Sequence, residues 1–183
     1  QSDGLGVRFV VFFEGCPMRC QYCHNPDTWV LTDGKQMEAD EIIDRFLRNA
    51  SFYRTGGITA TGGEPMLQID FLTELFAKAK AHGIHTCLDT SGIMFPGFPE
   101  DGEATSDITL EKIDRLLDVT DLVMLDIKHI RDEDHRKLTG HSNKNILAFA
   151  RYLDQKKKPV WIRHVVVPGI TFEEAELTEL GHF

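Results

Sequence analysis

Three of the four cysteines lie close together near the start of the chain, at Cys16, Cys20 and Cys23. Their spacing is C-x3-C-x2-C, and thiolates are soft ligands that suit zinc, copper(I) or iron–sulfur clusters. A structural zinc site normally has a fourth protein ligand from a second ligand pair, and no such pair follows. An iron–sulfur cubane held by only three cysteines keeps one iron open to a non-protein ligand. The triplet therefore favours a reactive cluster, with a zinc site as the alternative.

Five short apolar runs indicate the strands that must position these residues. They are nearly continuous, which is typical of strands buried on both faces in a parallel sheet. Helical patterns lie between them, and Asp70 is the expected N-cap of one helix. The alternating order predicts a parallel sheet with right-handed crossovers. The strands are expected at residues 7–13, 57–61, 84–89, 122–127 and 160–167, and the helices at 38–49, 70–82, 109–117 and 143–153. A surface loop is expected at 95–107.

Polar or glycine-containing segments follow each predicted strand. "GC" follows the first, "TGGEP" the second and "DTSG" the third, while "DIKH" overlaps the end of the fourth and "PG" follows the fifth. In barrels and open α/β sheets, ligands bind at the carboxyl ends of parallel strands. The sequence therefore predicts one shared site across this end of the sheet.

Composition limits the class of protein further. The chain has 183 residues and a formal net charge of -9, so an extended nucleic-acid surface, which requires a basic face, is not expected. No signal peptide or apolar run of membrane-spanning length is present in the sequence given. We expect one domain over residues 1–183, incomplete at its C-terminal end, in the cytoplasm and without membrane contact.

The cysteine motif resembles the signature of the radical S-adenosylmethionine (SAM) superfamily, with Tyr22 as the aromatic residue before Cys23. The "TGGEP" segment after the second strand resembles the superfamily's GGE motif. Within the superfamily the chain resembles the activases of glycyl radical enzymes, and among these the group that acts on pyruvate formate-lyase. That resemblance is carried by "SDGLGVRFVVFFEGCPMRCQYCHNPDTW", "GIHTCLDTSG", "VTDLVMLDIK" and "VWIRHVVVPG". Activases with a ferredoxin-like insertion carry extra cysteines where residues 25–56 here have none.

This resemblance implies both the fold and the chemistry. The fold would be α/β, a partial (β/α)6 TIM-like barrel with five β/α units present. A [4Fe-4S] cluster on the three cysteines would bind S-adenosylmethionine at its fourth iron and cleave it reductively. The resulting 5′-deoxyadenosyl radical would remove hydrogen from a backbone glycine of pyruvate formate-lyase. No catalytic side chain beyond cluster and cofactor is implied.

The implied partners are pyruvate formate-lyase and an electron donor such as flavodoxin, and we expect a monomer that binds no nucleic acid. Two alternatives stay open from the sequence. The chain could activate another glycyl radical enzyme, such as anaerobic ribonucleotide reductase, or it could be a zinc-stabilised binding module without catalysis.

The resemblance also assigns individual residues. A monovalent cation, Na+ or K+, would lie beside the cofactor carboxylate, held by Asp89, Thr90, Asp126 and the backbone oxygen of Met124; the alternative is that both aspartates are ordinary strand-end caps. Asp3 would lie near the glycine loop of the partner, although Leu5 replaces the proline usual in that turn. The cofactor contacts would come from Tyr22, Asn25, Gly62, Gly63, Glu64, Asp89, Lys128 and Arg163.

Two of these residues, Lys128 and Arg163, have a second interpretation on physical grounds. Lys128 would neutralise the cofactor carboxylate or be a solvated lysine at a strand end. Arg163 lies in an apolar run, where an unpaired charge is costly, so it should meet a ligand or form a structural salt bridge. Cys87, inside the third strand, is expected to be a buried free cysteine.

Overall fold

The computed structural model describes residues 4–32, 34–97 and 108–183. Its centre is a five-stranded sheet in the order β1-β2-β3-β4-β5. All four neighbouring pairs are parallel. This is the singly wound arrangement of a partial β/α barrel, and the predicted fold class is confirmed. The strands are β1 Arg8–Phe13, β2 Gly57–Gly62, β3 His85–Thr90, β4 Leu122–Asp126 and β5 Val160–Arg163.

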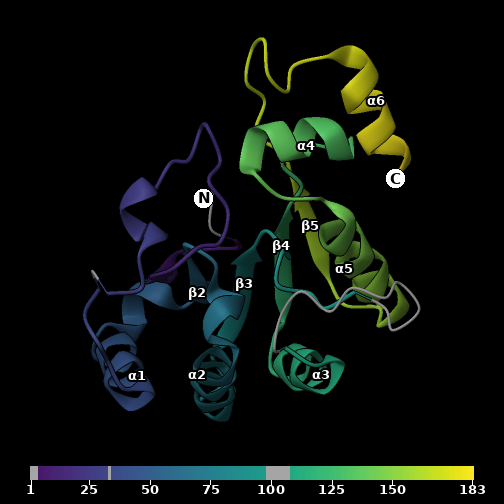
Figure 1. The fold of residues 1–183 in the computed structure, drawn as a ribbon. Helices are drawn as coiled ribbons and strands as arrows, with labels where there is room; N and C mark the ends of the chain where they lie inside the picture. The colour runs from purple at the N-terminus through teal and green to yellow at the C-terminus, as the bar shows by residue number, and fades with distance from the viewer. Residues whose placement is uncertain (1–3, 33, 98–107) are drawn as a thin grey trace.

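Figure 1 shows helices at both ends of the sheet, with α5 between them along its side. α1, α2 and α3 lie side by side at one end of the picture, while α4 and α6 lie at the opposite end, beyond β4 and β5. Because α4 directly follows β4, this second group lies at the carboxyl ends of the strands, where the site is expected. The helices are α1 Ala39–Arg48, α2 Ile69–Ala81, α3 Leu110–Asp118, α4 Asp132–Thr139, α5 Lys144–Gln155 and α6 Glu174–His182, with 3₁₀ helices at Pro26–Trp29, Ala50–Tyr53 and Pro65–Gln68.

Strand alternation decides which side chains face the helices and which face the inside of the partial barrel. Leu88, Val123 and Leu125 belong to the main hydrophobic core, which also contains apolar residues of α1, α2, α3 and α5. Cys87 and Met124 belong with Leu122 to a second, separate cluster. Two residues further along the same strands, this alternation brings Asp89 and Asp126 to the inner face at the strand ends.

The structure corrects several local expectations. β5 ends at Arg163, four residues before the predicted end at residue 167, and it is an edge strand whose Ile162 is 48% exposed, so it is not buried on both faces. Asp70 lies in the first turn of α2 and not at its N-cap, which is Gln68. Phe95, expected in a surface loop, is fully buried against Phe149. α4 was not predicted at all.

The helix expected at 109–117 is present as α3, and the expected burial of Cys87 is confirmed. Thr109 caps α3 by accepting a hydrogen bond from the Lys112 amide, and Cys87 is buried and in no disulfide. None of the helices in the described parts of the chain has the length and apolar character needed to cross a membrane.

Candidate active site

One cavity of about 630 Å³ opens at the carboxyl ends of the strands. Its wall combines the cysteine-containing loop after β1 with the ends of β2, β3, β4 and β5, so the shared site predicted from the strand ends is present. The lining residues are Phe12, Cys16, Met18, Cys20, Tyr22, Cys23, His24, Asn25, Thr28, Trp29, Thr61, Gly62, Gly63, Asp89, Thr90, Ser91, Asp126, Lys128, Arg163 and Val165.

The GGE segment holds the first part of the cysteine loop through backbone hydrogen bonds. The Gly63 amide donates to the Phe13 carbonyl at 2.8 Å, and the Glu64 amide donates to the Gly15 carbonyl at 2.7 Å. This approach requires glycine, because a Cβ on Gly63 would lie 2.2 Å from the Gly15 carbonyl oxygen. The glycines therefore set the distance between β2 and the loop that carries Cys16.

The end of α4 holds the second part of the loop. The Arg19 amide donates to the Thr139 carbonyl at 3.0 Å and the Gln21 amide to the Leu138 carbonyl at 3.1 Å. These are carbonyls from the last turn of the helix, which have no partner within the helix. Nε2 of His141 donates to the Pro17 carbonyl at 2.9 Å. No sequence pattern predicts these contacts, because the loop and α4 are more than 100 residues apart.

The three cysteine side chains are compatible with a cluster, whose irons they would bind separately. Cys16, Cys20 and Cys23 are in no disulfide and line the same cavity, yet no group of three or more His, Cys, Asp or Glu among the described residues is arranged to hold one metal ion. Cluster thiolates bind different irons, so they need not converge on one point. Burial, and next the charge of Glu64, raise the pKa of Cys16 to about 12. Metal binding at Cys16 must therefore displace a proton.

Glu64 lies under the cavity and not in its wall. Its side chain is fully buried. Oε1 accepts hydrogen bonds from Thr90 Oγ1 at 2.6 Å and the Met66 amide at 3.1 Å, and Oε2 accepts from Ser91 Oγ at 2.6 Å and the Ser91 amide at 3.1 Å. The carboxylate thus joins the end of β2 to the end of β3. The predicted contact of Glu64 with a cofactor stays a prediction, because Glu64 is not among the residues that line the cavity.

Asp89 and Arg163 form an ion pair on the cavity wall. Nη1 of Arg163 lies 2.7 Å from Oδ2 of Asp89, which also accepts a hydrogen bond from Thr61 Oγ1 at 2.8 Å. Burial raises the pKa of Asp89, although Arg163 and the hydrogen bond from Thr61 act in the opposite direction. Both readings of Arg163 are therefore compatible with the structure, since it forms a salt bridge and lines the cavity.

Asp126 and Lys128 form a second ion pair, with Nζ 2.6 Å from Oδ2. Burial alone would lower the pKa of Lys128, but the nearby Asp126, with smaller effects of Cys20 and Asp89, raises it above its usual value. Lys128 is therefore a buried, paired cation and not a solvated one. Nζ also lies 5.8 Å from the centre of the Tyr22 ring. Oδ1 of Asp126 is buried and has no hydrogen-bond partner among the described residues, so this oxygen is placed to accept a ligand or cation.

The remaining predicted residues fall in three places. Asn25, Gly62 and Thr90 line the cavity. The Met124 side chain lies in the second hydrophobic cluster, as expected for a residue that could offer only its backbone oxygen. Asp3 lies outside the described residues. Sequence reasoning missed Thr61, Ser91 and His141, although the first two lie in the strand-end segments that it singled out.

The comparisons with known proteins agree with this geometry. The model of the radical SAM superfamily matches residues 10–180. A pyruvate formate-lyase-activating enzyme of Streptococcus mutans is 52% identical over 99% of the chain, and the chain spans 67% of the length of that relative. The corresponding enzyme of Listeria monocytogenes is 47% identical over 99% of the chain, and the chain spans 71% of it.

Solved structures share the fold at lower identity. Streptococcus suis SuiB bound to S-adenosylmethionine matches 97% of this chain and 37% of its own, with a TM-score of 0.71 and 16% identity. A domain of a pyruvate-formate lyase-activating enzyme from Bacteroides vulgatus matches 69% of this chain and 70% of its own, with a TM-score of 0.58 and 24% identity. On the strength of the family match and the close relatives, the chain belongs to the radical SAM superfamily and, within it, to the pyruvate formate-lyase-activating enzymes.

Proposed function

We propose that the cavity binds a [4Fe-4S] cluster and S-adenosylmethionine together, and that the protein uses them to form the glycyl radical of pyruvate formate-lyase. When bound, this pair supplies an electron and a carbon radical, chemistry that no side chain can provide. The observation that carries the proposal is that three cysteines outside any disulfide and four charged strand-end residues line one cavity. Neither alternative from the sequence, a zinc-stabilised module or a ribonucleotide reductase activase, is favoured by any contact in the site.

The chain's own residues would bind and orient the two groups. Cys16, Cys20 and Cys23 would hold three irons of the cluster, which leaves the fourth iron without a protein ligand. The amino group of S-adenosylmethionine needs acceptors, and backbone carbonyl oxygens of Gly62 and Gly63, which both line the cavity, would serve as these acceptors. The carboxylate of S-adenosylmethionine needs a cation, for which Lys128 and Arg163 are the charged groups in the wall. Tyr22 and Asn25 would contact the adenosyl part.

A monovalent cation is proposed beside the cofactor carboxylate. Asp89 and Asp126 lie on the inner face of adjacent strands, in a cavity whose occupant would carry a third carboxylate, and like charges at close range repel. Oδ1 of Asp126, buried and without a hydrogen-bond partner in the described parts of the chain, supports a cation there. Thr90 would contribute less directly than expected, because its hydroxyl donates to Glu64 at 2.6 Å. Na+ and K+ are both compatible with oxygen ligands of this kind.

The partners follow from the same assignment. Pyruvate formate-lyase would bring its glycine loop to the cavity mouth, and an electron donor such as flavodoxin would approach the cluster edge. We infer a monomer located in the cytoplasm.

The test is anaerobic reconstitution with iron and sulfide, followed by electron paramagnetic resonance (EPR) of the reduced protein with and without S-adenosylmethionine. We expect a reduced-cluster signal that changes when S-adenosylmethionine is added, and a glycyl radical on pyruvate formate-lyase when that enzyme is included. Zinc without iron or sulfide in the purified protein would contradict the proposal. Radical formation only on anaerobic ribonucleotide reductase would mean that this reductase, and not pyruvate formate-lyase, is the protein substrate.

A further inference from the structure

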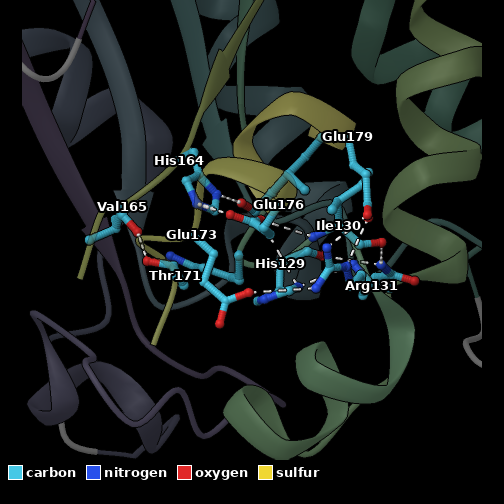
Figure 2. A network of polar contacts seen from close by, with 12 residues as sticks. His129, Ile130, Arg131, His164, Val165, Thr171, Glu173, Glu176 and Glu179 are labelled. Carbon is cyan, nitrogen blue, oxygen red and sulfur yellow. Dashed lines mark hydrogen bonds and ion pairs between the residues drawn. The ribbon is translucent and has the colours of Figure 1, made fainter. Parts of the chain in front are cut away.

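A fully buried carboxylate joins α6 to the ends of two strands (Figure 2). The side chain of Glu176 has 0% exposure, which is rare for a glutamate without partners. Its Oε2 lies 3.4 Å from Nε2 of His164. Its Oε1 accepts a hydrogen bond from the Ile130 amide at 3.4 Å and lies 4.0 Å from Nδ1 of His129. The other acids of this region, Glu173 and Glu179, are exposed and pair with Arg131.

The hydrogen-bond partners of His164 fix where its protons lie. Nδ1 is 2.7 Å from the Ile127 carbonyl oxygen, which can only accept, so Nδ1 carries a hydrogen. Nε2 of His164 and Oε2 of Glu176 have no hydrogen-bond partner among the described residues and face each other inside the protein. Nδ1 of His164 is thus the atom that donates to β4, and Nε2 is the ring atom that lies 3.4 Å from Oε2 of Glu176. The imidazole ring is therefore tied to β4 on one side and to α6 on the other.

This chain of contacts ends at the charged residues of the cavity. The Ile127 amide donates to the Arg163 carbonyl at 3.0 Å, while the Ile127 carbonyl accepts from the His164 ring. Ile127 is thus clamped by two consecutive residues of the β5 end. Lys128, which lines the cavity, follows Ile127 directly, and Arg163 precedes His164. Oε1 of Glu176 also holds the Ile130 amide, two residues beyond Lys128.

We propose that Glu176 is a positioning residue which, through His164, holds Ile127 and so sets the places of Lys128 and Arg163 in the cavity. Glu176 itself does not line the cavity. The inference rests on the proposed function, in which these two cations face the carboxylate of S-adenosylmethionine. Helix α6 then belongs to the cofactor site although none of its side chains reaches it.

Three variants of the reconstituted protein test this role, with S-adenosylmethionine titrated against the EPR signal of the reduced cluster. Glu176→Ala removes the tie, and we expect the dissociation constant to rise about tenfold while iron content stays that of the parent. Glu176→Gln should bind within about threefold of the parent, because its amide can donate to Nε2 of His164 and accept from Ile130. Glu179→Gln, an exposed carboxylate on the same helix, should bind like the parent. Parent-like affinity of Glu176→Ala would overturn the proposal.

A double-mutant cycle tests whether Glu176 acts through His164. His164→Phe breaks the same contacts from the β5 side, so we expect it to weaken binding like Glu176→Ala and the double variant to be no weaker than either. If the losses in binding free energy of the two single variants add up in the double variant, Glu176 does not act through His164. If Glu176→Ala does not fold, His164→Phe carries the same test of affinity.

Hydrogen exchange separates failure of this inference from failure of the proposed function. The Ile127 amide, measured without S-adenosylmethionine, should exchange faster in Glu176→Ala than in the parent, while Glu179→Gln should leave it unchanged. If the parent binds no S-adenosylmethionine, the proposed function fails and this exchange rate still decides whether Glu176 clamps Ile127. Unchanged exchange would overturn the clamp whatever the cofactor result.

Discussion

Arg163 places Nη1 2.7 Å from Oδ2 of Asp89, so a residue from β5 reaches across to β3 over the β4 strand between them. Asp89 is nevertheless mostly buried, and burial raises its pKa above the value of an exposed aspartate even with Arg163 and the Thr61 hydroxyl as partners. The pair therefore holds a carboxylate that is harder to ionise in the folded protein than in the unfolded chain.

Asp89→Asn should change how stability depends on pH. Because the folded pKa of Asp89 is raised, the folded state binds more protons than the unfolded state between the two pKa values, and stability falls as pH rises there. The stability of the parent relative to Asp89→Asn, taken as the difference between their unfolding free energies, should therefore be largest below about pH 3.9, the usual aspartate pKa. It should decrease as pH rises through the folded pKa. Urea unfolding of both proteins across this range measures it, and a difference that grows with pH would show that Arg163 outweighs burial.

Glu64→Ala should destabilise the fold strongly. The side chain is fully buried and accepts hydrogen bonds from Thr90, Ser91 and the Met66 amide. Removing it leaves these donors without an acceptor inside the protein, which we expect to lower the unfolding free energy by about 2–4 kcal/mol. Denaturant unfolding measures this loss. Glu74→Ala, an exposed glutamate on α2, is the control and should change stability by less than about 0.5 kcal/mol; equal losses in the two variants would contradict the role given to Glu64.

Gly63→Ala should impair cluster assembly. The added Cβ would lie 2.2 Å from the Gly15 carbonyl oxygen and 2.8 Å from the Thr28 carbonyl oxygen, both backbone atoms of the cysteine loop. The loop must therefore move, and we expect less iron per chain after reconstitution and lower stability. Gly181→Ala is the matched control, because no atom lies within 4 Å of its added Cβ. It lies in α6, where alanine is favoured over glycine by about 1 kcal/mol, and iron content should be unchanged.

The cysteine triplet could be predicted from the spacing of its cysteines. The strand-end acids could be predicted from the alternation of side chains along a strand. Parallel strands end at one edge, and alternation along β3 and β4 brings Asp89 and Asp126 to the same inner face. The family resemblance added the roles of these residues. The roles of Glu64 and Glu176 could not be predicted, because both sit in segments that are typical of exposed turns or helix starts. Only the fold shows that each carboxylate points into the protein.

α4 escaped prediction for a related reason. Its sequence, DEDHRKLT, is dominated by charged residues and buries only His135, Leu138 and Thr139. Hydrophobic periodicity therefore gives little signal over so short a segment. What holds the helix in place is polar: backbone groups of its last turn bind a loop that lies far away in sequence. Long-range hydrogen bonds of this kind leave no pattern in the sequence around them.

His141→Ala should make the cluster easier to lose. His141 Nε2 donates to the Pro17 carbonyl at 2.9 Å, between Cys16 and Cys20, so the variant leaves that carbonyl without this donor and loosens the loop from α4. The cost in unfolding free energy should be only about 0.5–1.5 kcal/mol, while iron release to a chelator, followed by loss of the cluster's absorbance, should be clearly faster. His82→Ala, which changes an exposed histidine at the end of α2, should release iron at the parent rate. Because Arg19 and Gln21 still bind the last turn of α4 in His141→Ala, a release rate equal to that of His82→Ala would mean that these two backbone contacts alone hold the cysteine loop.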